Sequence, residues 1–484
     1  MRPAVWVRRR AFAAGAAIML AVVVAAAPAS PARAASSGTV TVPLDWAHPA
    51  AGTTHVAYRL IARRDRSAPA RSTILYNPGG PGDAPIALAA VVRRRLAPLL
   101  EHRDLLLVDP RGTGRSDALH CRGERDVVLA LGRREALLRA IGACGRELGA
   151  RARMYGSAAV ADDLETVRAK LGIQRLDLWG ESYGTYLMQV FVARHREHVR
   201  SAVLSGAYPV DFDPWGRDRL ATARRAISLI CARTRTCRGA TVLRDLAHAA
   251  ARLRRAPVRF TATLAGRRIP VVLDEGALAQ LVYAQGDPRL LRRLPGALAA
   301  TRTQGLRPLR RLLVGQLRAL AALITDPATA AVFNIAQGFA TECHDYPRAF
   351  SYADPFPARH AAYDRALAEL APRPFRPFSP RGWSRAGFEG TDTCLEWPAD
   401  PTAEPPLTPG ARLPGVPALV LSGDLDANTP PSAGRQVARR FGHATWALIA
   451  NAGHTPTDGS PCAVTLATRF VRTLKARPDA CARP

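Results

Sequence analysis

A serine between two glycines is the first feature of the chain that could carry out chemistry. Ser182 lies in the segment Gly180–Gly184, which reads G-x-S-x-G and follows the apolar run Leu176–Trp179. Between a strand and a helix, this motif holds the serine on a sharp turn at the strand's carboxyl end. The glycines leave room for a strained turn and close helix packing. A serine hydroxyl needs a neighbouring base to be a good nucleophile, so the motif predicts an acid and a base downstream.

An acidic loop follows a second apolar run. The loop Gly423–Pro430 comes directly after the predicted strand Ala418–Leu421 and carries two aspartates, Asp424 and Asp426. Both qualify by their chemistry as the acid that orients a catalytic histidine. We choose Asp426 because a Gly-x-x-Asp spacing recurs at this acid in enzymes with such a nucleophile turn. Asp424 is then interpreted as a turn or surface residue.

One histidine stands where the base is expected. His454 follows the predicted strand Thr445–Ile449 and is preceded by Gly453. The chain has 11 histidines, so the residue type alone carries little weight. Serine, aspartate, histidine is, however, the chain order of the triad in α/β hydrolases. We therefore predict that Ser182, Asp426 and His454 form a catalytic triad.

A glycine-rich loop could stabilise the negative charge that develops during acyl transfer. The loop Asn77–Gly82 follows the predicted strand Ser72–Tyr76 and can point backbone N–H groups at an oxyanion. We expect the two donors to be the N–H groups of Tyr183 and Gly80. No G-K-[ST] follows the loop, which argues against a phosphate-binding loop. The segment Asp109–Ser116 is interpreted as a structural turn near the site.

The elements that would position these loops are short buried strands with helical patterns between them. The fold class is therefore α/β, with a mostly parallel central sheet and helices on both faces. One predicted helix is Ala159–Leu171, with Asp162 and Asp163 in its first turn, where acids favour the helix dipole. The six predicted strands are Ser72–Tyr76, Leu105–Val108, Leu176–Trp179, Ala202–Leu204, Ala418–Leu421 and Thr445–Ile449.

A long middle segment interrupts the strand pattern. Residues 35–210 are predicted to be the first part of the α/β-hydrolase core, and residues 211–408 an inserted, mainly helical cap. Residues 409–484 complete the core with the acid and the base. Ligands bind at the carboxyl ends of such sheets, so the cap should cover the site.

The first 34 residues have the pattern of a signal peptide. Arginines precede the uncharged run Ala11–Ala27, and the segment ends in Ala32-Arg33-Ala34, an A-x-A cleavage pattern. An uncleaved membrane anchor is the alternative, but the run is short for a span. We therefore predict a secreted protein, extracellular or associated with the cell wall.

The cysteines fit an oxidising compartment. There are eight, none inside the predicted signal and none in a C-x-x-C pair, so neither a metal site nor a cofactor is expected. We predict disulfides, and locality alone suggests sequential pairing. The pairs would be Cys121–Cys144, Cys231–Cys237, Cys343–Cys394 and Cys462–Cys481.

The chain is strongly basic, with a formal net charge of +29 that falls to +24 without the five arginines of the predicted signal. Lys170 and Lys475 are the only lysines, and the arginines are spread along the sequence. This favours a generally arginine-rich composition over a dedicated binding site for an anionic partner. There is no nucleic-acid-binding motif, so a nucleic-acid partner is not expected. Nonspecific adhesion to an anionic cell wall or membrane surface is expected instead.

Taken together, these motifs resemble the secreted actinobacterial tripeptidyl aminopeptidases and related proteases of the prolyl-aminopeptidase family. The resemblance covers most of both core parts and implies a serine exopeptidase that removes short peptides from free N-termini. It departs from the family at Ser205, where an aspartate is usual, and after His454, where Thr455 replaces the usual glycine. The matching segments are Val42–Trp46, Asn77–Gly82, Asp109–Ser116, Trp179–Thr185, Gly423–Pro430 and Gly453–Cys481.

The resemblance also implies that carboxylates of the cap hold the substrate's ammonium group. For each of them, pairing with an arginine of the protein is the alternative. The candidates are Glu342, Asp345, Asp392 and Glu396. An esterase or lipase that uses the same triad is a second interpretation of the chain. A non-catalytic protein that binds the cell wall is a third.

Overall fold

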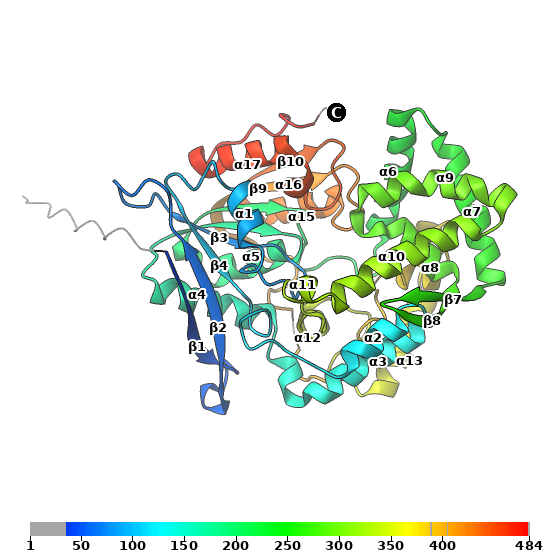
Figure 1. Ribbon diagram of the computed structural model, residues 1–484, viewed down its shortest axis with the longest axis horizontal. Coiled ribbons are helices and arrows are strands. Elements are labelled where there is room, and N and C mark those ends of the chain that lie inside the picture. Colours follow the sequence, from blue (N-terminus) through cyan, green and yellow to red (C-terminus); the bar gives the residue numbers. More distant parts are fainter. Residues whose placement is uncertain (1–34, 388–389, 404, 483–484) are drawn as a thin grey trace, which may run out of the picture.

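The computed structural model of the chain describes residues 35–387, 390–403 and 405–482 (Figure 1). The predicted signal peptide, residues 1–34, lies outside the described residues. No helix in the described part of the chain is long and apolar enough to cross a bilayer.

An eight-stranded sheet forms the centre of the fold, in the order β1-β2-β4-β3-β5-β6-β9-β10. The pairs β1–β2 and β2–β4 are antiparallel, and all other neighbours are parallel. Six strands coincide with the six predicted apolar runs, apart from Ser72, which precedes β3, and this confirms the predicted mostly parallel sheet. The strands are β1 (Ser36–Pro43), β2 (Thr53–Ile61), β3 (Thr73–Asn77), β4 (Asp104–Val108), β5 (Leu176–Glu181), β6 (Val199–Ser205), β9 (Leu413–Gly423) and β10 (Phe441–Ile449).

Helices cover both faces of this sheet, as expected. Alternate strand residues point to opposite faces: Leu75 packs on one face, while Ile74 and Tyr76 pack on the other. The face of Leu75 is covered by α4 (Ser157–Lys170), α5 (Tyr183–Arg194) and α15 (Pro431–Arg440). The opposite face is covered by α1 (Ala89–Arg95) and α17 (Pro461–Thr473).

The start of helix α4 differs from the prediction. The helix begins at Ser157, so Asp162 and Asp163 lie in its second turn and do not act on the helix terminus. Their carboxylates bind arginines instead: Asp162 binds Arg194 Nε at 2.8 Å, and Asp163 binds Arg111 Nε at 2.6 Å. These ion pairs, rather than the helix dipole, account for the two acids.

The cap lies between β6 and β9, on one side of the sheet (green to yellow in Figure 1). It is mainly helical and also contains the antiparallel pair β7–β8. Its elements are α6 (Arg217–Thr234), α7 (Gly239–Arg255), β7 (Val258–Leu264), β8 (Arg267–Leu273), α8 (Glu275–Tyr283), η4 (Ala284–Gly286), α9 (Pro288–Gln304), α10 (Arg307–Thr325), α11 (Pro327–Ala330), α12 (Ile335–Asp345), α13 (Phe356–Ala368), η5 (Arg373–Phe375) and α14 (Pro380–Ser384).

Two helices that precede the nucleophile in sequence also pack with the cap. They are α2 (Gly123–Ala130) and α3 (Arg134–Leu148), and their buried side chains share a core with those of α8 and α10. The N–H of Val272 in β8 donates to the carbonyl of Gly132 at 2.9 Å. Figure 1 shows α2 and α3 beside β7 and β8. The predicted domain boundary at residue 211 therefore assigns α2 and α3 to the first part of the core, although they pack with the cap.

Four disulfides cross-link the described chain, in the sequential order expected from the sequence. Cys121–Cys144 joins the start of α2 to α3, and Cys343–Cys394 ties α12 to a later cap segment. Cys231–Cys237 closes a short loop after α6, and Cys462–Cys481 fastens the C-terminal segment to α17. No free cysteine and no metal-ligand cluster is found among the described residues.

Candidate active site

Ser182 sits on a strained turn between β5 and α5. Its backbone has φ 52° and ψ −128°, an unfavourable conformation for a residue with a side chain that costs about 1–3 kcal/mol. A Cβ at Gly180 would lie 2.5 Å from the carbonyl oxygen of Gly184, and a Cβ at Gly184 would lie 2.4 Å from that of Asn77. Both flanking positions therefore require glycine, which explains the motif.

The structure brings Ser182, His454 and Asp426 together at the carboxyl ends of β5, β10 and β9. Ser182 Oγ lies 2.7 Å from His454 Nε2, and His454 Nδ1 lies 3.1 Å from Asp426 Oδ2. The carboxylate is fully buried, whereas the imidazole is 16 % exposed. An imidazole in this position can take the proton of the serine hydroxyl.

The acid loop holds the Asp426 carboxylate rigidly. Its Oδ1 accepts the N–H groups of Asn428 at 2.8 Å and Thr429 at 2.9 Å. Its Oδ2 accepts the Thr429 hydroxyl at 2.6 Å. Asp424, the alternative acid, instead binds Arg233 Nη2 at 2.6 Å. Only Asp426 of the two aspartates contacts the imidazole.

The glycine-rich loop packs directly on the nucleophile turn. A Cβ at Gly79 would lie 2.8 Å from the Cβ of Ser182 and 3.1 Å from the backbone nitrogen of Tyr183. Tyr183 is the first residue of α5, so its N–H has no partner within the helix. Gly79 donates its own N–H to the Asn77 side chain at 3.0 Å, and the next residue, Gly80, has φ 96°. Gly80 as the second oxyanion donor stays a prediction.

Two protein families match the segments that carry this geometry. Residues 72–227 match the family described as alpha/beta hydrolase fold, and residues 379–481 match the one described as TAP-like protein. The first match contains Ser182 and the glycine-rich loop, and the second contains Asp426 and His454. The chain has the α/β-hydrolase fold. Its resemblance to the tripeptidyl aminopeptidases, predicted from the motifs, is confirmed.

Several curated proteins are similar to parts of this chain. Tripeptidyl aminopeptidase of Streptomyces lividans is 29 % identical over 183 residues, which are 34 % of either chain. Serine protease Hip1 of Mycobacterium tuberculosis (strain ATCC 25618 / H37Rv) is 29 % identical over 193 residues, 37 % of this chain and 36 % of that one. Carboxylesterase B of the same strain is 34 % identical over 97 residues, 19 % of this chain and 18 % of that one. The similarity thus spans about a third or less of each relative.

Among solved structures, proline iminopeptidase of Mycobacterium smegmatis is 14 % identical and aligns with a TM-score of 0.39. That alignment covers 90 % of this chain and 98 % of the other.

The cap rests on the loop that carries His454. The backbone N–H of His454 donates to the carbonyl of Gly286 in η4 at 3.0 Å. Gly286 has φ 71°, and a Cβ there would lie 2.6 Å from Asp426 Oδ1 and 2.9 Å from the Cβ of His454. The cap backbone therefore fits against Asp426 and His454 with no space for a side chain.

Three polar residues near the imidazole are not predicted by any sequence motif. Asn428 is buried, and its Nδ2 lies 3.2 Å from His454 Nε2. The hydroxyls of Tyr208 and Tyr283 both donate to Asn428 Oδ1, that of Tyr208 at 2.9 Å. Tyr283 is a cap residue 145 positions from Asn428, and no local pattern could have joined them. Asn428 could have been noticed as a polar residue inside the acid loop.

The cap carboxylates predicted to hold an ammonium group all contact groups of the protein. Arg134 binds Asp392 with two guanidinium nitrogens, one of them at 3.2 Å. Asp345 accepts the Ser157 N–H at 2.7 Å and contacts the His344 ring at 2.8 Å. The remaining two have longer ionic contacts, Glu342 with Arg348 at 3.8 Å and Glu396 with His360 at 3.5 Å.

Asp345 is also linked to the nucleophile turn. The Tyr183 hydroxyl contacts the Ser157 hydroxyl at 2.7 Å, and the Ser157 hydroxyl binds the Asp345 carboxylate. The residue after the nucleophile therefore shares a hydrogen-bonded network with one of the predicted amine-binding acids.

Buried charges lie behind Ser182. Arg95 binds Glu181, the residue before Ser182, at 2.8 Å, and the Tyr76 hydroxyl donates to the same carboxylate at 2.8 Å. Burial and the nearby charge of Asp458 raise the pKa of Glu181. The same two causes raise the pKa of Asp83, at the end of the glycine-rich loop, to about 7. The site therefore has acids that titrate above their usual range.

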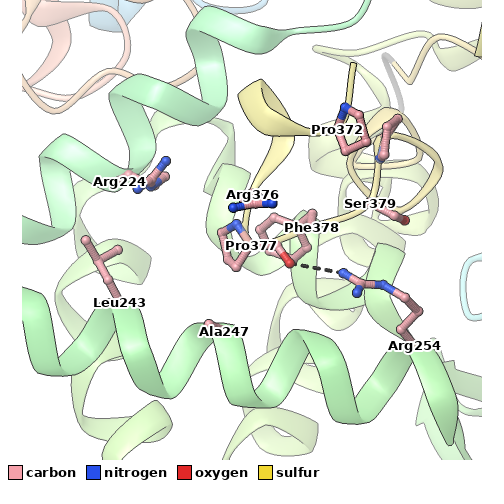
Figure 2. A pocket seen from close by; sticks show the side chains of 10 residues that line it. Arg224, Leu243, Ala247, Arg254, Pro372, Arg376, Pro377, Phe378 and Ser379 are labelled. Carbon is pink, nitrogen blue, oxygen red and sulfur yellow. Dashed lines mark hydrogen bonds between the residues drawn. The ribbon is translucent and has the colours of Figure 1, made fainter. Parts of the chain in front are cut away.

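A separate hollow of about 580 Å³ lies between α6, α7 and the segment 372–380 of the cap (Figure 2). Figure 2 shows Arg224 and Arg376 beside it, and Arg254 donating to the carbonyl of Pro377 at 3.0 Å. None of the residues that line it is acidic, and none belongs to the triad. Arg254 is paired with Glu275, so Arg224 and Arg376 supply the positive charge of this hollow.

Proposed function

We propose that the chain is a secreted serine exopeptidase with Ser182 as its nucleophile. The observation that carries the proposal is the pair of contacts at His454, 2.7 Å to Ser182 Oγ and 3.1 Å to Asp426 Oδ2. The strained backbone of Ser182 supports it as well, because such strain is typical of nucleophile turns.

In the proposed mechanism, Ser182 Oγ attacks the scissile carbonyl carbon while His454 Nε2 takes the hydroxyl proton. The carbonyl oxygen becomes an oxyanion that the N–H groups of Tyr183 and Gly80 bind. His454 then gives its proton to the leaving amine, the C–N bond breaks, and an ester to Ser182 forms. Water hydrolyses this ester with the same base, which restores the serine.

Cleavage near a free N-terminus is the finer part of the proposal. It rests on the similarity to the proteins named tripeptidyl aminopeptidase and on the acids of the cap. The substrate ammonium group would bind among Glu342, Asp345, Asp392 and Glu396. Asp392 is the least suited of them, because both of its oxygens already bind Arg134.

Export is part of the same proposal. Four disulfides are typical of a protein that matures in an oxidising compartment, and the basic start with an A-x-A pattern provides a route to it. Adhesion to anionic surfaces outside the cell is proposed for the mature chain. The hollow of Figure 2 supports this through Arg224 and Arg376, whereas its third arginine, Arg254, is paired with Glu275.

An esterase is the second candidate function, supported by the similarity of 97 residues to a protein named carboxylesterase B. The triad chemistry is common to both candidates, so the substrate decides between them. We expect mass spectrometry of a mixed peptide library to detect short peptides released from free N-termini and little cleavage of N-blocked peptides. Equal cleavage of blocked peptides would contradict the exopeptidase, and faster turnover of acyl esters than of any peptide would favour the esterase.

A further inference from the structure

A row of polar side chains links the cap to the imidazole nitrogen that faces the nucleophile. The hydroxyl of Tyr283, the last residue of α8, donates to Asn428 Oδ1. At the other end of the same amide, Nδ2 lies 3.2 Å from His454 Nε2. That nitrogen is also 2.7 Å from Ser182 Oγ. The Asn428 amide therefore contacts the atom that would accept the nucleophile's proton.

The orientation of the amide is fixed by its neighbours. Tyr208 donates a second hydroxyl to Asn428 Oδ1 at 2.9 Å. Arg219 Nη2 donates to the Tyr208 oxygen at 3.2 Å, which leaves the hydroxyl proton for Asn428. A reversed amide would place Oδ1 against the lone pair of His454 Nε2. Two hydroxyl donors therefore keep Nδ2 directed at the imidazole.

This contact suits one protonation state of His454 and opposes the other. Asp426 accepts the proton on Nδ1, so in the neutral ring Nε2 carries one lone pair, and the Ser182 hydroxyl and Asn428 Nδ2 both donate toward it. When Nε2 gains the proton of Ser182, an N–H donor faces the N–H donors of the amide. The amide therefore stabilises the neutral ring relative to the charged one.

We propose that Asn428, held by Tyr208 and the cap residue Tyr283, keeps His454 neutral in the resting enzyme and promotes transfer of its proton to the leaving amine. The inference rests on the proposed function, because it concerns the same base. Asn428 and Tyr283 act through His454 and are positioning residues. The cap would then influence the chemistry of the site as well as cover it.

The other charged groups around His454 come from separate elements. Asp426, on the loop after β9, favours the charged ring. Arg219 of α6 opposes it, with its guanidinium carbon 5.5 Å from the centre of the Tyr208 ring. On the loop of His454 itself, Asp458 accepts the hydroxyl of Thr455 at 2.7 Å. Gly286 of the cap contributes only its backbone. All of these groups are retained when position 428 or 283 is changed.

The test is the pH dependence of labelling by a fluorophosphonate, which reacts with a serine activated by a neutral base. In Asn428→Ala the midpoint of the acid limb should rise by about half to one pH unit, the equivalent of one ordinary hydrogen bond. In Asn428→Asp it should rise further, because a carboxylate beside Nε2 favours the charged ring. Midpoints that equal that of the unchanged protein in both variants would overturn the inference.

A milder change at the cap end provides an independent check. Tyr283→Phe removes one of the two hydroxyls on Oδ1 and should raise the midpoint by less than Asn428→Ala does. Tyr352→Phe is the matched control, since it removes a buried cap hydroxyl that binds the carbonyl of Glu342 at 3.0 Å, away from the imidazole. An equal shift in the two variants would contradict the inference. If Ser182 is labelled but the variants have the same midpoint as the unchanged protein, only the inference is overturned. If the unchanged protein is not labelled at all, the proposed function is overturned as well.

Discussion

The carbonyl of Gly286 in the cap accepts a 3.0 Å hydrogen bond from the backbone N–H of His454 in the core. The same glycine lies so close to Asp426 and His454 that a Cβ would overlap both. The cap therefore helps to hold Asp426 and His454 in place, although it is an insertion between β6 and β9. Changes in the cap should affect catalysis through this contact.

Replacement of Gly286 by alanine should lower kcat/KM by about 10- to 100-fold, because a small displacement of a catalytic base has effects of that size. Gly266→Ala is the matched control: Gly266 also has a positive φ, 74°, but nothing lies within 4 Å of its Cβ position. Kinetics on a peptide substrate would compare them. Similar losses in both variants would show that backbone strain, and not contact with the triad, causes the effect.

The Arg134–Asp392 ion pair should matter for stability more than for substrate binding. The two side chains are only 11 % and 2 % exposed, so Asp392→Asn leaves a buried arginine without its counter-charge. We expect the free energy of unfolding to fall by about 3 kcal/mol, measured by urea denaturation. Asp364→Asn, in an exposed pair with Arg381, should cost less than about 1 kcal/mol. A raised KM with unchanged stability in Asp392→Asn would instead identify Asp392 as an amine-binding residue.

Asp83 should make stability depend on pH. Its pKa is raised to about 7 by burial and by Asp458, whereas an aspartate in the unfolded chain titrates near 4. The folded state holds the proton more tightly than the unfolded state does. The contribution of Asp83 to the free energy of unfolding therefore declines as the pH rises from about 4 to about 7, and it is constant below and above this range. The difference in melting temperature between Asp83→Asn and the unchanged protein should therefore shift in favour of the variant as the pH rises from about 4 to about 7.

A second aspartate gives the control for this pH series. Hydrogen bonds from Ser67 lower the pKa of Asp65, so its contribution has the opposite sign and is lost as the pH falls. Asp65→Asn should not gain stability relative to the unchanged protein between about pH 4 and 7. If Asp83→Asn also shows no gain, Asp83 does not titrate as its surroundings indicate.

The sequence was informative where chemistry depends on the ends of strands. Ser182, Asp426 and His454 each follow a strand, and parallel strands bring their carboxyl ends to one edge, so chain order was enough to predict the contacts. Strands β1 and β2 were not predicted, because they are only partly buried and belong to an antiparallel edge.

Contacts across the cap could not be predicted in the same way. Two hydrogen bonds join segments that are more than a hundred residues apart in the sequence: one links Tyr283 to Asn428, and the other links His454 to Gly286. Side chains on separate elements come into contact only when the cap packs against the core. No local periodicity in the sequence predicts that packing. For the same reason, the sequence did not reveal that α2 and α3 share the core of the cap.

The central claim is that Ser182 is an activated nucleophile, and covalent labelling with a fluorophosphonate followed by peptide mass spectrometry tests it most directly. The mature protein should carry one adduct, on the peptide that contains Ser182. The Ser182→Ala variant should be secreted and folded with the same melting temperature within error, yet carry no adduct and have no hydrolytic activity. An adduct on another residue, or unchanged activity in Ser182→Ala, would contradict the account.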